Sequence, residues 1–252
     1  MAPALEVNKR SAGMSARFSN SVVMVAGGTG GLGRAVARAF LMEGAVVIVT
    51  YRSEQEFDEF TRSVDAPRER LEGLRVDLAD ATATFALVQD VVARHSRLDT
   101  LVNAVGGYAG GAPLWEIDTS VLDRMLTLNL RAPYALLRAV IPTMLKQRHG
   151  CLVTVAAKAG VDPPARAAAY AASKAAELAM MDALAAELVG TGIRANSILP
   201  SIIDTAANRS AMPKADFAQW PKPQDIAQVI LFLCSDEAKV IHGASIPVYG
   251  DR

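Results

Sequence analysis

The sequence has little of what marks secreted, membrane-spanning or disulfide-bonded proteins. Its 252 residues include two cysteines, Cys151 and Cys234, each inside an apolar stretch, so buried free thiols in a reducing compartment are favoured over a disulfide. No uncharged apolar run reaches about 18 residues, the length that a membrane-spanning helix needs. The first twenty residues contain no apolar segment of signal-peptide length. We therefore expect a cytoplasmic protein that has no contact with membranes.

An excess of charge of either sign is missing as well. Lysine and arginine together number 26, as do aspartate and glutamate, and no basic run occurs, so no nucleic-acid partner is expected. The histidines, His95, His149 and His242, do not follow the spacing of metal ligands, and no metal site is predicted. The sequence also lacks the Gly-x-Ser-x-Gly motif of hydrolases and the Gly-Lys-Ser/Thr end of a P-loop. A protein that acts on a small-molecule substrate is the expected class.

Strand-like and helix-like segments alternate along the chain, and 51% of the residues are hydrophobic. Strands are expected at 22–26, 46–50, 74–77, 98–103, 152–156, 194–199 and 245–249. Helices are expected at 31–44, 54–64, 81–95, 119–147, 166–189 and 224–235. The long helix 119–147 should bend or break at Pro133 and Pro142. The alternation predicts an α/β fold, a single doubly wound parallel-sheet (Rossmann) domain over residues 20–252, after a loose extension at 1–19.

A glycine-rich turn follows the first expected strand, in the order Gly27-Gly28-Thr29-Gly30-Gly31-Leu32-Gly33. Without Cβ atoms, Gly27, Gly31 and Gly33 let the backbone turn tightly, approach a pyrophosphate and pack the next helix on the sheet. The start of that helix then presents unpaired N–H groups to the phosphates. An ordinary strand-to-helix loop is the alternative, but the position at a helix start favours a dinucleotide site.

Tyr170 and Lys174 stand four residues apart in an expected helix, in the segment Tyr-Ala-Ala-Ser-Lys. Residues with this spacing share one helix face, with Cβ atoms about 5–6 Å apart. An ammonium near a phenol favours the phenolate and lowers the pKa of the phenol. Such a phenol can act as a general acid or base near neutral pH. The alternative for Tyr170 alone is an ordinary half-buried helix tyrosine.

The Gly-x-x-x-Gly-x-Gly spacing, with Tyr170 and Lys174 far downstream, resembles the short-chain dehydrogenase/reductase family from residue 20 to residue 250. The resemblance implies hydride transfer with a nicotinamide dinucleotide, Tyr170 as proton donor, and Lys174 and Asn129 as its catalytic partners. Beyond the glycine turn, the resemblance places Asp77 and Leu78 beside the adenine of the cofactor. It places Asn103, Ala104 and Val105 under the cofactor, and Pro200, Ile202 and Thr205 around the nicotinamide carboxamide. It also implies self-association as a tetramer or dimer through helices 119–147 and 166–189.

The choice of cofactor depends on the end of the second strand, which reads Tyr51-Arg52-Ser53. An acidic residue there would bind a ribose diol and repel a 2′-phosphate. Arg52 can instead pair with a phosphate through two hydrogen bonds. NADP(H) is therefore favoured, while Glu54 nearby keeps NAD(H) open as the alternative.

One residue departs from the family pattern. Where the family has a serine that hydrogen-bonds the substrate carbonyl, this chain has Ala157, followed by Lys158. Thr154 lies too deep on the strand to replace that serine. In other enzymes the loss of one such donor lowers the rate by about 10²–10³. Three alternatives are open: the substrate is not a simple carbonyl, another hydroxyl supplies the donor, or catalysis is weak.

The Ala-Lys pair, together with Gly106-Gly107-Tyr108-Ala109-Gly110-Gly111, is similar to the quinonoid dihydropteridine reductase branch of the family. This local resemblance implies an imine-like or quinonoid ring as substrate, with Tyr108, Ala157 and Trp220 on the substrate side. An ordinary ketone reductase is the broader alternative, and a low-activity cofactor sensor or assembly protein is the alternative outside catalysis. The loop 201–222, which carries Trp220, is either a lid that excludes water or a surface loop that packs its own aromatic residues.

Overall fold

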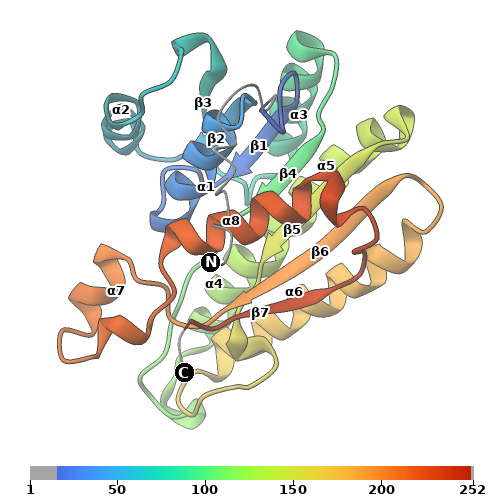
Figure 1. The fold of residues 1–252 in the computed structure, drawn as a ribbon. Helices are drawn as coiled ribbons and strands as arrows, with labels where there is room; N and C mark the ends of the chain where they lie inside the picture. The colour runs from blue at the N-terminus through green and yellow to red at the C-terminus, as the bar shows by residue number, and fades with distance from the viewer. Residues whose placement is uncertain (1–15, 251–252) are drawn as a thin grey trace, which may run out of the picture.

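The computed structural model describes residues 16–250, which build a seven-stranded, all-parallel sheet in the order β3-β2-β1-β4-β5-β6-β7 (Figure 1). The strands are β1 Val22–Ala26, β2 Val46–Tyr51, β3 Leu71–Arg75, β4 Thr100–Asn103, β5 Gly150–Val155, β6 Ile193–Pro200 and β7 Ser245–Val248. The predicted doubly wound α/β fold is thus confirmed. Strands buried on both faces explain the continuous apolar runs of the sequence.

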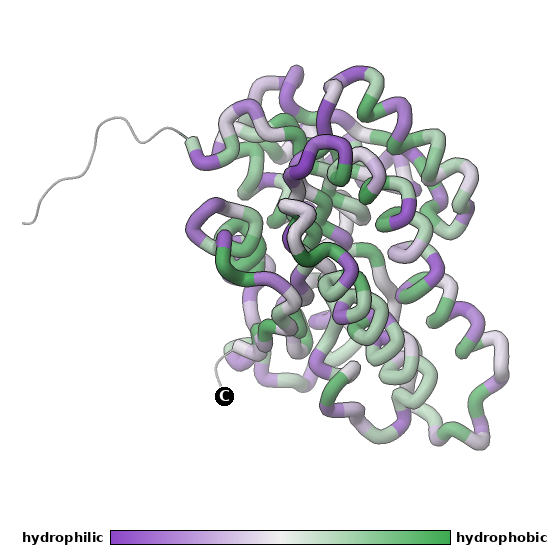
Figure 2. Tube along the Cα trace, turned by 90° about the vertical axis from the view of Figure 1, so that its right-hand side faces the viewer, coloured by the Kyte–Doolittle hydropathy of each residue, from purple (hydrophilic) through white to green (hydrophobic). Residues whose placement is uncertain are grey.

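Helices cover both faces of the sheet. They are α1 Gly31–Met42, α2 Glu54–Ser63, α3 Ala81–His95, α4 Thr119–Leu126, α5 Ala132–Gln147, α6 Ala168–Glu187, α7 Ala206–Ala211 and α8 Pro223–Cys234. Side chains of α1 and α8 pack against one face of the strands, and those of α3, α5 and α6 against the other. In Figure 2 hydrophobic and hydrophilic residues alternate along the helices, as expected of elements with one buried face.

The direction in which successive strands are added reverses between β1 and β4. From β1 the chain adds β2 and β3 on one side, then crosses back to place β4 on the other side of β1. Ala26 and Asn103 are paired at the ends of β1 and β4, and Ala104 N donates to Ala26 O (3.0 Å). In open α/β sheets, ligands bind in the crevice outside the carboxyl ends of the strands at such a point.

Two predicted elements differ in the structure. The helix expected at 119–147 is divided by a π-helical turn, Thr127–Arg131, whereas Pro133 lies in the first turn of α5 and Pro142 lies inside α5. Proline has no backbone N–H to donate to a carbonyl of the preceding turn. The wider π-helical turn just before Pro133 makes room for the missing hydrogen bond. The strand expected at 74–77 occupies Leu71–Arg75 instead. This strand lies at the edge of the sheet and is only half-buried. Its residues therefore need not be apolar, and the apolar pattern of the sequence does not show where the strand begins and ends.

Part of the extension expected at 1–19 packs on the domain. Phe18, which falls in the extension expected at 1–19, is buried (4% exposed) and packs edge-on against Phe40 at a centroid distance of 4.8 Å. Arg17 forms an ion pair with Glu43 (2.7 Å). The remainder of that extension, residues 1–15, lies outside the described residues. No helix among residues 16–250 is both long and apolar enough to cross a bilayer.

Candidate active site

The glycine turn connects β1 to α1, and its geometry disfavours a side chain at Gly27, Gly31 and Gly33. Gly27 has a φ of +74°, and a Cβ added to Gly33 would lie 2.1 Å from the Gly27 carbonyl oxygen. A Cβ on Gly31 would lie 2.7 Å from Cγ2 of Thr205. No side chain caps the N-terminus of α1, so its first N–H groups are free to bind an anion. The turn therefore fits the pyrophosphate of a dinucleotide.

Thr29 and Leu32 face inward from this turn. Leu32 is part of the core beneath α1. Thr29 Oγ1 donates to Glu56 Oε2 (3.1 Å), and Arg34 Nε donates to Thr29 O (2.6 Å). Glu56, on α2, was not singled out from the sequence, because the acidic surface of α2 has no motif. It ties the glycine turn to the segment that follows β2.

The residues after β2 carry charges of both signs. Arg52 is exposed and makes no hydrogen bond or ion pair with another described residue. Glu54 instead accepts a hydrogen bond from Tyr51 Oη (2.9 Å). The arginine is thus free to meet a ligand phosphate, while this neighbouring carboxylate is already engaged.

The other predicted cofactor residues lie at the carboxyl ends of β3, β4 and β6. Asp77 is exposed and its Oδ1 accepts from Ala79 N (3.0 Å), while Leu78 is buried. The side chain of Asn103 is buried beneath the crevice, where its Oδ1 accepts from Val105 N (3.3 Å). Pro200 ends β6, and Ile202 and Thr205 follow it, with Thr205 close enough to Gly31 to place that segment over the glycine turn.

Tyr170 lies in the first turn of α6, half-buried, with its ring edge-on to the ring of Tyr108 at a centroid distance of 5.0 Å. Burial, the negative charge of Glu177 and the nearby Tyr108 raise the pKa of Tyr170 to about 12. The expected lowering by Lys174 is therefore wrong for the protein as described. The first physical reason is burial of the phenol, and the second is a carboxylate, unsuspected from the sequence, that also holds the Lys174 ammonium.

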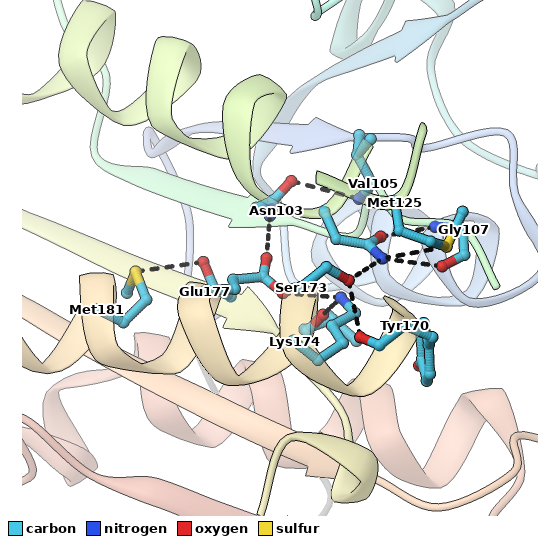
Figure 3. A network of polar contacts seen from close by, with 12 residues as sticks. Asn103, Val105, Gly107, Met125, Tyr170, Ser173, Lys174, Glu177 and Met181 are labelled. Carbon is cyan, nitrogen blue, oxygen red and sulfur yellow. Dashed lines mark hydrogen bonds and ion pairs between the residues drawn. The ribbon is translucent and has the colours of Figure 1, made fainter. Parts of the chain in front are cut away.

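That partner is Glu177, one helical turn beyond Lys174 on α6. Lys174 Nζ donates to Glu177 Oε2 (2.8 Å) and to Val155 O (3.0 Å), and both side chains are almost fully buried (Figure 3). Asn103 Nδ2 donates to the other oxygen of the carboxylate (3.2 Å). Burial raises the pKa of Glu177 to about 7, although the Lys174 ammonium acts in the opposite direction.

Asn129 projects from the π-helical turn toward Gly107 and Ser173. Its Nδ2 donates to Gly107 O (3.0 Å) and to Ser173 Oγ (2.9 Å), and its Oδ1 accepts from Gly107 N (2.8 Å). Ser173 Oγ in turn donates to Tyr170 O (2.7 Å). The structure thus brings Asn129 next to α6. Ser173, between the two residues of the Tyr–Lys motif, was missed although helical spacing could have found it.

Ala157 lies just after β5, buried, where the family has a serine. Thr154 is also buried, and its Oγ1 faces Met181 Sδ at 3.5 Å. Lys158 Nζ is paired with Asp162 (3.0 Å) and lies 5.2 Å from the centre of the Tyr249 ring. Neither neighbour of Ala157 therefore places a donor where the serine hydroxyl would stand.

The segment 201–222 is only partly a loop, since it contains α7 and a short 3₁₀ turn at Phe217–Gln219. Its aromatic residues pack on one another: Phe217 and Trp220 have ring centroids 5.0 Å apart. Arg209 lies over the Phe217 ring at 4.8 Å and pairs with Asp204. Trp220 thus packs within its own segment, which is the second of the two alternatives predicted for it.

A glycine turn for a dinucleotide, joined to a tyrosine–lysine helix at the crevice of a parallel sheet, defines a nicotinamide-dependent oxidoreductase. A family model described as "short chain dehydrogenase" matches residues 21–216. The chain belongs to the short-chain dehydrogenase/reductase family and is an NAD(P)-dependent enzyme of that family.

Relatives cover almost the whole chain. The 3-oxoacyl-(acyl-carrier-protein) reductase of Thermotoga maritima is 30% identical over 93% of this chain and 98% of its own length. The meso-2,3-butanediol dehydrogenase of Serratia marcescens is 31% identical over 93% of this chain and 95% of its own length. Among solved structures, levodione reductase superposes with a TM-score of 0.86 at 27% identity, over 92% of this chain and 97% of that chain.

Proposed function

We propose that the protein reduces a small carbonyl, imine or quinonoid substrate with NAD(P)H, and that Tyr170 donates the proton. The observation that carries this proposal is the cluster of Tyr170, Lys174 and Asn129, together with a glycine turn in which Cβ atoms on Gly31 and Gly33 would clash. The bound dinucleotide supplies the hydride. Tyr170 holds the phenolic proton in a half-buried position, where its raised pKa keeps the phenol protonated at neutral pH.

The residues that would hold the cofactor follow the carboxyl ends of β1, β3, β4 and β6. The free N–H groups of α1 suit the pyrophosphate, and Asp77 and Leu78 suit the adenine end. The backbone of Ala104 and Val105 forms the floor, which the buried Asn103 side chain supports. Thr205, in contact with Gly31, suits the nicotinamide end.

The preferred cofactor of this proposal is NADPH. Arg52 is free of carboxylate partners among the described residues, whereas Glu54 is hydrogen-bonded to Tyr51. Hydrogen bonds to charged groups contribute about 1.5–3 kcal/mol each, which corresponds to about 10–100-fold in affinity. Comparison of kcat/KM for NADPH and NADH tests the preference, and faster turnover with NADH would contradict it.

The substrate in this proposal is a flat imine-like or quinonoid ring, with quinonoid dihydropterin as the specific candidate. Two observations favour a flat ring: Ala157 offers no hydroxyl to a carbonyl oxygen, and Tyr108 is 66% exposed next to Tyr170. An exposed aromatic ring is a stacking surface for a planar ligand. A ketone is the second candidate, supported by relatives named as 3-oxoacyl and diol oxidoreductases.

The experiment measures NADPH and NADH oxidation against a panel of quinonoid dihydropterin, ketones and quinones. Turnover that Tyr170→Phe abolishes, while the variant still binds the cofactor, supports the proposal. Unchanged activity in Tyr170→Phe contradicts the role of the proton donor. Tight cofactor binding without turnover on any member of the panel would favour a cofactor sensor or assembly protein instead.

Self-association stays a prediction from the resemblance. Exposed apolar side chains on α4 and α5, namely Leu122, Tyr134 and Leu145, are consistent with it. Light scattering of the purified protein would show a dimer or tetramer if the prediction is right, and a monomer would contradict it.

A further inference from the structure

Glu177 is a buried carboxylate to which neither the motifs nor the proposed mechanism assigns a role. Of the charged side chains in residues 16–250, three are buried: Asp99, Lys174 and Glu177. Asp99 reaches the surface through its ion pair with the half-exposed Arg97 (2.6 Å). Glu177 has no exposed ion-pair partner among the described residues and is bonded to the buried Lys174 inside the candidate site. Burial of a charge has a high desolvation cost, and a charge in this position acts on the neighbouring groups Lys174 and Tyr170.

We propose that Glu177 is a positioning residue, acting through Lys174, whose protonation state sets how strongly the Lys174 ammonium promotes ionisation of Tyr170. The inference rests on the proposed role of Tyr170 as proton donor. While Glu177 is ionised, it cancels the field of the ammonium and keeps the proton on Tyr170. Once Glu177 is protonated, the ammonium is uncompensated and the Tyr170 phenol ionises more readily.

The hydrogen bonds show that the pair acts as a unit. Two of the three donors of Lys174 Nζ are directed to Glu177 Oε2 and Val155 O. The remaining side of the ammonium faces Gly106, where an added Cβ would lie 3.3 Å from Nζ. The ammonium is thus held on the inner side of the crevice by its carboxylate partner, and Glu177 is held in turn by Asn103.

The helix places all three groups on one face. Tyr170, Lys174 and Glu177 follow the spacing i, i+4 and i+7 along α6. Seven residues of helix rise about 10 Å, and at an effective dielectric constant of about 20 a unit charge at that distance changes a pKa by about one unit. In agreement with this, the negative charge of Glu177 is a cause of the raised pKa of Tyr170, second to burial.

The surrounding elements bring no other charge to the pair among the described residues. Asn103 from β4 and Val155 from β5 contribute an amide and a carbonyl. Asn129, from the π-helical turn, brings a second amide near Lys174, since a Cβ on Gly106 would lie 3.1 Å from Asn129 Oδ1 and 3.3 Å from Lys174 Nζ. Tyr108, after β4, is the other titratable group that faces Tyr170. The titration of Glu177, with its pKa raised by burial to about 7, therefore reports directly on the charge next to Lys174.

The consequence is a preference for the direction of reduction. A proton donor must keep its proton as the pH rises, and ionised Glu177 opposes the loss of that proton above about pH 7. In Glu177→Gln the ammonium of Lys174 is uncompensated at every pH. We expect the pKa of Tyr170 to fall by about one unit. The rate of reduction should then begin to decline at a lower pH as the pH rises, and the rate of the reverse oxidation near neutral pH should increase.

The test follows the ionisation of Tyr170 without turnover. Ultraviolet absorbance of the phenolate is titrated in the wild type and in Glu177→Gln, each corrected with its Tyr170→Phe counterpart, alone and with NADP⁺. Glu187→Gln, the same substitution at the exposed end of α6, is the matched control. The expected result is a Tyr170 midpoint lowered by about one pH unit in Glu177→Gln and unchanged in the control. Equal midpoints in the wild type and Glu177→Gln would overturn the inference.

A second measurement needs no substitution at Glu177. In wild-type protein with ¹³C-labelled tyrosine, the Tyr170 ring resonance should change in a step near pH 7, where Glu177 titrates. A flat response through that range overturns the inference even if Glu177→Gln fails to fold. Both readouts are independent of activity, so a shifted midpoint in a protein without turnover would contradict the proposed function alone.

Discussion

Removal of the lysine from the buried pair is the most direct test of how the site is held together. Lys174→Met keeps an unbranched side chain of similar length but leaves Glu177, which is 0% exposed, without its ammonium partner. Loss of one partner of a buried ion pair costs about 3–5 kcal/mol. That cost depends on pH, because protonation of Glu177 removes its charge.

The sign follows from the raised pKa of Glu177. The folded protein holds the Glu177 proton up to about pH 7, whereas the unfolded chain releases it near 4.5. Stability from this group is therefore complete below about pH 4.5 and declines as the pH rises toward 7. The Lys174 ammonium limits this rise of the pKa, so the decline should extend to a higher pH in Lys174→Met.

Urea unfolding at pH 5 and pH 9 measures the effect. Relative to the wild type, we expect Lys174→Met to lose about 1 kcal/mol at pH 5, the contribution of a lost hydrogen bond. At pH 9 the loss should reach about 3–5 kcal/mol, since the carboxylate is then forced to ionise or to bind a proton at a cost. The double variant Lys174→Met/Glu177→Met should recover most of the loss at pH 9. Lys214→Met, at an exposed lysine, is the control.

An equal loss of stability at pH 5 and pH 9 would refute this reasoning, because it would mean that Glu177 carries no charge in the folded protein. Failure of the double variant to recover would indicate that packing, and not charge, determines the stability of this part of α6.

Three further predictions concern the cofactor and the substrate. Gly33→Ala should weaken NADP(H) binding by at least about 10-fold in a fluorescence titration, since its Cβ would lie 2.1 Å from Gly27 O and shift the turn; unchanged affinity would contradict the pyrophosphate site. Arg52→Ala should raise the Kd for NADPH about 10-fold and leave that for NADH unchanged, and an equal effect on both would remove the 2′-phosphate argument. Ala157→Ser should raise kcat/KM for ketones by about 10² without a similar gain for quinonoid substrates, so a gain for neither would show that this position does not contact the substrate.

Local patterns predicted much of the fold because its central strands are buried on both faces. The apolar runs of β1 and β2 mark the strands closely, since each residue of the run meets a helix layer or a neighbouring strand. The edge strand β3 was displaced in the prediction, because half-buried residues carry no continuous pattern. A bend or break in the long helix was predicted at Pro133 and Pro142, but α5 continues through Pro142, and the interruption before Pro133 is a π-helical turn whose Asn129 is hydrogen-bonded to Gly107 and Ser173.

The sequence by itself determined the family and the fold, because glycine spacing and a tyrosine–lysine pair depend on local backbone and helix geometry. Only the tertiary structure decided the charge around Tyr170. Burial of the phenol, followed by the negative charge of Glu177, raises the pKa of Tyr170, while the Lys174 ammonium is bonded to Glu177 and to a strand carbonyl. Which partner a charged side chain takes depends on burial and on contacts between distant segments, and the spacing of residues along one helix does not contain that information.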